Sequence, residues 1–149
     1  MAVDIDLVLA PVDCSDDAEQ AAEYALAIAE KYGADLHLLH ILDQRVKQGL
    51  DCGDLSPETI ADEQRAFTGR VRRQNPNSDT VSISQSSAIG FSQTQLARTP
   101  GSVILDAADE LAADFLVVPR VTPSGSTDEV LGKAALHVLE YASQPVLSV

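Results

Sequence analysis

The chain has few of the residues that cross-link small secreted domains. Its 149 residues include two cysteines, Cys14 and Cys52, no tryptophan, and only 4% aromatic residues. Two isolated thiols cannot form a disulfide scaffold, and they fit a reducing compartment. We therefore expect a fold that depends on its apolar core and not on disulfide bonds.

Long apolar runs are also missing. Hydrophobic residues make up 45% of the chain, yet no segment approaches the ~20 apolar residues of a membrane-spanning helix. Asp4 and Asp6 interrupt the N-terminal region, which does not match a signal peptide. The chain is too apolar to be disordered and has the length of one domain. These features predict a single cytoplasmic domain over residues 1–149, without a membrane partner.

Basic residues are scarce. Ten lysines and arginines stand against 23 aspartates and glutamates, which gives a formal net charge of −13. Such a surface repels nucleic acid and anionic membranes, because both require basic patches. Two interpretations remain, an ordinary acidic protein or a halophilic one whose self-repulsion is screened by salt. The composition favours the halophilic interpretation.

The histidines do not predict a catalytic or metal site. His37 and His40 lie three residues apart in a predicted strand, so their side chains should point to opposite faces and cannot bind one metal ion together. His137 belongs to the last predicted helix. No cysteine or histidine spacing typical of zinc sites occurs. We expect structural roles for all three histidines, no catalytic residue and no bound metal.

Apolar runs alternate with helical patterns along the chain. Ser56-Pro57 is a typical helix start, and Gly33 a typical helix end. Residues 44–55 are interpreted as a loop, and residues 82–92 as a serine-rich excursion before a third strand at 92–97. The other predicted strands are Ile5–Val12, Leu36–Leu42, Phe115–Val118 and Val146–Val149.

Alternating strands and helices predict an α/β fold, a doubly wound parallel sheet with helices on both faces. In such sheets ligands bind beyond the carboxyl ends of the strands, where the strand order reverses. This rule places Asp13, after the first strand, near the loop that follows Pro119.

The segment from Val117 to Gly132 contains the parts of an anion site. A strand, a loop of small residues and a helix N-terminus direct free N–H groups and a positive dipole toward one point. Ser126 and Glu129, however, form a capping box, which would start the helix early and satisfy those N–H groups internally. If the helix starts near Gly132 instead, the loop is free to hold a ligand. Both alternatives remain open.

Three segments, Leu7–Ser15, Gly101–Val118 and Leu131–Val149, together resemble the universal stress protein family. The resemblance covers most of the chain outside about residues 44–95. It implies a five-stranded parallel sheet in the order 3-2-1-4-5, a regulatory role in stress response without catalysis, and a homodimer. It also implies an unidentified protein partner.

The resemblance further implies a nucleotide cleft. In the members of the family that bind ATP, an aspartate after the first strand and backbone at the end of the second strand hold the nucleoside. The phosphates are held by Gly, two residues, Gly, nine residues, Gly, and then Ser or Thr. The corresponding positions of this chain are Val12, Asp13, Ile41, Pro119, Thr122, Gly132 and Lys133.

Only Gly132 matches the phosphate motif. Pro119 has no N–H to donate, Thr122 has a Cβ where glycine permits close approach, and Lys133 has no hydroxyl. We therefore expect no cofactor and no ATP binding of the usual type. The alternative is a member that binds ATP or AMP, with slow nucleotide hydrolysis.

The final strand, Val146–Val149, predicts the assembly. In the implied order it lies at the sheet edge, where its unpaired backbone groups are a hazard on a monomer. Antiparallel pairing with the same strand of a second copy satisfies them. We expect a homodimer through Val146–Val149.

Overall fold

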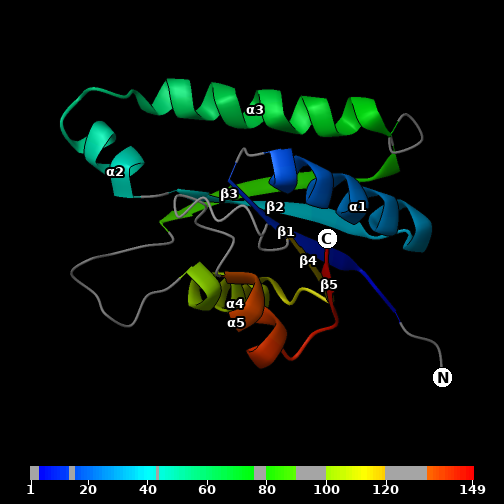
Figure 1. Ribbon diagram of the computed structural model, residues 1–149. Coiled ribbons are helices and arrows are strands. Elements are labelled where there is room, and N and C mark those ends of the chain that lie inside the picture. The colour runs from blue at the N-terminus through cyan, green and yellow to red at the C-terminus, as the bar shows by residue number, and fades with distance from the viewer. Residues whose placement is uncertain (1–3, 14–15, 43, 76–79, 90–99, 120–133) are drawn as a thin grey trace.

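The computed structural model describes residues 4–13, 16–42, 44–75, 80–89, 100–119 and 134–149 (Figure 1). Within them, five strands form one parallel sheet in the order β3-β2-β1-β4-β5. This order confirms the fold class expected from the sequence. The strands are β1 (Leu7–Val12), β2 (Asp35–Leu42), β3 (Ile83–Ile89), β4 (Phe115–Val118) and β5 (Val146–Ser148).

Helices cover both faces of the sheet. Helices α1 and α3 lie on one face, and α4 and α5 lie on the other, while α2 lies beside one end of α3 (Figure 1). This arrangement is the doubly wound architecture, in which right-handed crossovers place helices on one face until the strand order reverses and on the other face after it. The helices are α1 (Asp16–Tyr32), α2 (Gln44–Asp51), α3 (Pro57–Gln74), α4 (Pro100–Leu111) and α5 (Ala134–Tyr141).

The core lies where the central strands meet α1. Val8, Leu9 and Leu116 are fully buried, as expected for parallel strands that are covered on both faces. The buried face of α1 consists mainly of alanines, whose small side chains let this helix pack closely on the sheet. By contrast, α3 buries only Phe67 and Val71. Each of these two side chains contributes about 1.5–3 kcal/mol through burial.

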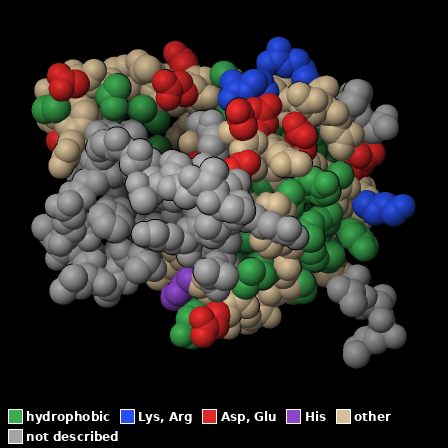
Figure 2. All heavy atoms as spheres, viewed as in Figure 1, with side chains coloured by type: hydrophobic (Ala, Val, Ile, Leu, Met, Phe, Trp, Pro, Cys, Tyr) green, Lys and Arg blue, Asp and Glu red, His purple; other side chains and the backbone are tan. Residues whose placement is uncertain are grey.

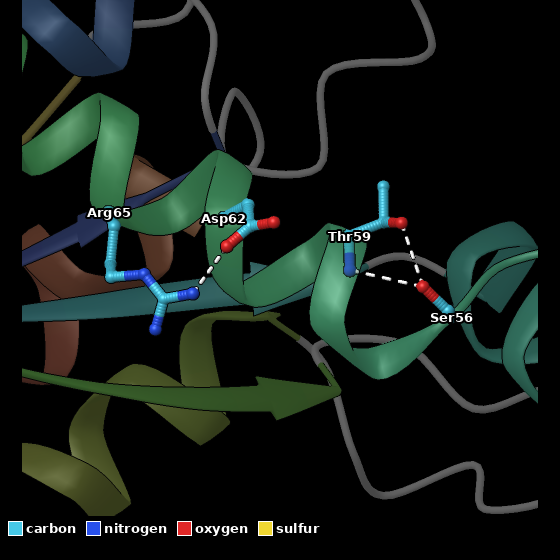
Figure 3. A network of polar contacts seen from close by, with 4 residues as sticks. All are labelled: Ser56, Thr59, Asp62 and Arg65. Atoms are coloured by element: carbon cyan, nitrogen blue, oxygen red, sulfur yellow. Dashed lines mark hydrogen bonds and ion pairs between the residues drawn. The ribbon is translucent and has the colours of Figure 1, made fainter.

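Two helix boundaries follow the local chemistry of the sequence. Gly33, after α1, has a φ of +66°, a conformation that glycine adopts without strain. Ser56 caps α3, because its hydroxyl accepts a hydrogen bond from the Thr59 N–H at 3.1 Å (Figure 3). One turn further, Asp62 and Arg65 form an ion pair (Figure 3). The pair is exposed and therefore contributes little to stability.

The prediction of a loop at residues 44–55 was wrong. Residues 44–51 form α2, and Gly53, with a φ of +82°, reverses the chain after it. Gly49 lies inside α2, where its missing side chain leaves room for Leu55. A Cβ at Gly49 would lie 2.6 Å from the Leu55 side chain, which folds back against the helix. A tertiary contact thus outweighs the weak helix propensity of glycine.

The prediction for residues 82–92 was also wrong. Most of this segment is β3, which pairs in parallel with β2 from Leu36↔Ile83 to Leu42↔Ile89. The strand lies at the edge of the sheet, so its serines face solvent or polar partners and not an apolar core. The strand that was expected at residues 92–97 falls outside the described residues.

Candidate functional site

The strand order reverses between β1 and β4, which makes their carboxyl ends the switch point of the sheet. The two strands pair only from Val8↔Phe115 to Leu9↔Leu116. Both nevertheless continue further, to Val12 and Val118. The ladder between the central strands therefore stops before the strands end.

Two prolines explain why this ladder stops. At its start, the Asp114 N–H donates to the Leu7 carbonyl and the Asp114 carboxylate accepts from the Leu7 N–H, so the odd-numbered residues of β1 face β4. Continued parallel pairing would need the N–H of residue 11 for the Val117 carbonyl, and the N–H of residue 119 for the carbonyl of residue 11. Both positions are proline, which has no N–H. Ladder bonds between β1 and β4 cannot form there, so the pairing of these two strands ends where the fold class places its ligands.

The predicted cleft residues that the structure describes lie at this end of the sheet. Val12 is fully buried, Ile41 is 3% exposed, and Pro119 is buried. Their side chains belong to the interior, so only their backbone can serve a ligand. Asp13 is half-buried directly after β1, and it is the one acidic side chain among these four residues. Thr122, Gly132 and Lys133 lie outside the described residues.

A second polar cluster lies between β2 and β3. The His37 ring is only 7% exposed, and it lies between two serine hydroxyls. Its Nδ1 is 2.7 Å from Ser84 Oγ, and its Nε2 is 2.8 Å from Ser86 Oγ. Burial lowers the pKa of His37 below its ordinary value of 6.5 because it disfavours the charged imidazolium. The ring is therefore neutral at pH 7, with one nitrogen protonated and one free to accept a proton.

His40 lies on the opposite face of β2, as the strand spacing predicted. Its Nε2 is 3.2 Å from Gln85 Oε1, an oxygen that also lies 3.0 Å from Thr68 Oγ1. Its ring meets the edge of Phe67 at a centroid distance of 5.9 Å. Nδ1 of His40 is buried and has no hydrogen-bond partner among the described residues. Burial lowers its pKa, the Gln85 hydrogen bond opposes this shift, and the charge of His37 adds to it.

The sequence interpretation missed the residues around these rings, because it placed Ser84, Gln85 and Ser86 in an excursion. One signal was present. Val81 and Ile83 alternate with serines, which is the period of a half-buried strand. Parallel pairing with β2 then brings the serines to His37.

The described residues offer little else for chemistry. None of their histidines, cysteines, aspartates and glutamates form a group of three that could hold a metal ion. His137 is half-buried in α5, with its ring centroid 4.8 Å from that of Tyr141. In the same part of the chain, no helix has the length and apolarity needed to cross a membrane.

Comparison with known proteins identifies the family. The profile of the universal stress protein family matches residues 5–149. A universal stress protein of Methanocaldococcus jannaschii is 23% identical over 145 residues, which cover 95% of this chain and 80% of that protein.

Solved structures show the same fold. A universal stress protein in complex with cAMP superposes with a TM-score of 0.69 at 23% identity, covering 98% of this chain and 97% of that one. A universal stress protein of Archaeoglobus fulgidus in complex with dAMP superposes with a TM-score of 0.60 at 19% identity, covering 99% and 98%. Because the family profile covers nearly the whole sequence, this chain belongs to the universal stress protein family.

Proposed function

We propose that this chain is a regulatory binding protein that takes an adenosine monophosphate at the switch point of the sheet, in preference to ATP, and does no chemistry on it. The observation that carries the proposal is the end of the β1–β4 ladder at Leu9↔Leu116. Beyond this point β1 and β4 no longer pair with each other, although each still pairs with its outer neighbour. Asp13 follows directly after β1 at this end of the sheet. Two structural relatives, in complex with cAMP and dAMP, support a ligand with one phosphate.

The preference for a monophosphate rests on lost hydrogen-bond donors. Pro119, directly after β4, cannot donate an N–H to a phosphate oxygen, and Thr122 and Lys133 replace a glycine and a hydroxyl residue of the usual motif. A hydrogen bond to a charged group contributes about 1.5–3 kcal/mol, so two lost bonds weaken binding roughly 100-fold or more. AMP needs fewer such donors than ATP. The net charge of −13 also opposes a more highly charged ligand.

Thermal shift measurements in molar KCl test this proposal. A ligand that binds only the folded protein raises the melting temperature, and at equal concentration the tighter ligand raises it more. AMP and cAMP should raise it, and Mg-ATP at the same concentration should raise it less. In Asp13→Ala the AMP shift should be lost, while exposed Asp16→Ala, three residues away, serves as the matched control. The absence of a shift with any nucleotide would contradict the proposal.

The proposed assembly is a homodimer through β5. This strand lies at the sheet edge, and among the described strands it pairs only with β4. Its residues Val146, Leu147 and Ser148 are half-buried, so they retain surface for a partner. A second copy of β5, paired antiparallel about a two-fold axis, would extend the sheet across both subunits. The two acidic subunits repel each other, and salt screens this repulsion. The dimer should therefore be more stable at high salt, as in a halophilic protein.

A further inference from the structure

The cluster of His37, Ser84 and Ser86 has the components of an activated nucleophile. A serine hydroxyl becomes reactive when a neighbouring base accepts its proton, and the base works best when a third group orients it. Both nitrogens of the His37 ring lie within 2.8 Å of a serine hydroxyl. In the neutral ring one nitrogen must accept and the other must donate. One serine therefore donates its proton to the imidazole, and the other serine holds the ring in place.

The two serines are accessible although the base is not. Ser84 and Ser86 are exposed on β3, whereas His37 is 7% exposed. The burial that lowers the pKa of His37 keeps the ring unprotonated, and no charged side chain among the described residues contributes to that shift. The site thus combines a neutral base with reachable hydroxyls at the outer edge of the sheet.

The backbone of the edge strand supplies a further element. The Leu36 N–H donates to the Ser82 carbonyl, so the even-numbered residues of β3 direct their backbone groups toward β2. The N–H groups of Gln85 and Ser87 therefore point away from the sheet. Gln85 follows Ser84 in the chain, and Ser87 follows Ser86. Each N–H can therefore donate a hydrogen bond to the carbonyl oxygen of an ester that the preceding serine attacks, where negative charge develops.

From this geometry we propose that Ser84 or Ser86 is a site of covalent acylation by activated carboxylic esters or thioesters, with His37 as the general base. The hydroxyl proton moves to the imidazole nitrogen as Oγ bonds to the carbonyl carbon. The bond to the leaving alkoxide or thiolate then breaks, and the imidazolium gives its proton to that group. The products are an acyl-serine and a free alcohol or thiol. This site is separate from the nucleotide cleft and does not depend on it.

The probe is p-nitrophenyl acetate, followed by release of p-nitrophenol and by peptide mass mapping. We expect acetylation at Ser84 or Ser86, and none at Ser82 or at Ser87, whose hydroxyl is bonded to Gln64. His37→Gln should slow the reaction about 100-fold or more, the range of general-base catalysis. Ser84→Ala with Ser86→Ala should abolish it, and the single variants, which each leave His37 one serine partner, identify the serine that reacts. Ser87→Ala, the matched control, should react like the original chain.

The pH profile separates a base from a merely structural imidazole. With His37 as the base, the acetylation rate should level off above pH 7, because a pKa lowered below 6.5 leaves the ring mainly neutral there. An unassisted serine would react about tenfold faster per pH unit, in step with hydroxide. A profile that follows hydroxide, equal rates in His37→Gln, or acetyl groups spread over Ser82 and Ser87 would each overturn the proposal.

Discussion

Pro11 in β1 and Pro119 after β4 occupy the two positions whose N–H groups would extend the ladder between the central strands beyond Leu9↔Leu116. At the other end of the same ladder, the Asp114 carboxylate accepts hydrogen bonds from the Asp6 and Leu7 N–H groups, at 2.8 and 3.1 Å. Strands β1 and β4 are thus hydrogen-bonded to each other at their amino ends and not at their carboxyl ends. The carboxyl ends are where this fold class binds ligands.

Gly101 permits the close approach of α4 and α5. A Cβ at this position would lie 2.6 Å from Cδ2 and 2.8 Å from Cβ of His137. Gly101→Ala should lower the free energy of unfolding by about 1–3 kcal/mol, the usual cost of overpacking. In α3, Gly69→Ala would meet only an Arg73 nitrogen at 3.8 Å, so it should raise stability by up to about 1 kcal/mol through helix propensity. Urea denaturation of both variants checks this contrast, and equal effects would contradict it.

The two buried imidazoles should destabilise the fold in mild acid. Their pKa values are lowered in the folded protein, so the unfolded chain binds protons first as the pH falls below 6.5. The contribution of the neutral rings to the free energy of unfolding is therefore fully present above pH 6.5. It declines toward pH 5, by at most about 1.4 kcal/mol per pH unit for each proton. His40→Leu, which removes the unpartnered Nδ1, should flatten this decline. Denaturation curves from pH 5 to 7.5 test the prediction. It would be refuted if stability fell as steeply with pH in His40→Leu as in the original chain.

Salt should stabilise the chain, because it screens the repulsion within a net charge of −13. Figure 2 shows acidic side chains scattered over one face and basic ones at only a few places. The melting temperature should rise strongly between low salt and molar KCl, as followed by circular dichroism. A melting temperature that does not change with salt would contradict the halophilic interpretation but not the fold assignment.

Lysine at the edge strand should separate the proposed dimer. Leu147 is half-buried in β5, and Leu147→Lys would place a charge where the strands of two copies are expected to pair. Light scattering at tens of micromolar in molar KCl should give a dimer for the original chain and a monomer for this variant. Ser143→Lys, at an exposed position before the strand, should remain dimeric. A monomeric original chain would contradict the assembly.

Much of the fold could be predicted because its central strands are buried on both faces. Leu7–Val12 and Phe115–Val118 are nearly continuous apolar runs, and Ser56 and Gly33 mark helix ends by local chemistry. The edge strand β3 was missed because its serines are satisfied by partners distant in sequence. Ser84 contacts His37, and Ser87 contacts Gln64, which no local pattern reveals.

The candidate site was predictable only in part. Val12, Asp13 and Ile41 follow from the rule that ligands bind at the carboxyl ends of parallel strands. The role of Pro11 in ending the β1–β4 ladder could not be predicted without the pairing register. The register shows that the backbone of this residue faces β4 and not β2. Residues 120–133, with Thr122, Gly132 and Lys133, lie outside the described part of the chain, so their place in the cleft stays a prediction.

Calorimetric titration of AMP and Mg-ATP in molar KCl tests the nucleotide preference most directly. The chain should bind AMP more tightly than Mg-ATP, and Mg-ATP no more tightly than the high-micromolar range, because Pro119, Thr122 and Lys133 supply too few donors. The triple variant Pro119→Gly, Thr122→Gly, Lys133→Ser restores the family's phosphate motif and should bind Mg-ATP roughly 100-fold more tightly than the original chain. Low-micromolar binding of Mg-ATP by the original chain, or a triple variant with unchanged affinity, would contradict the account.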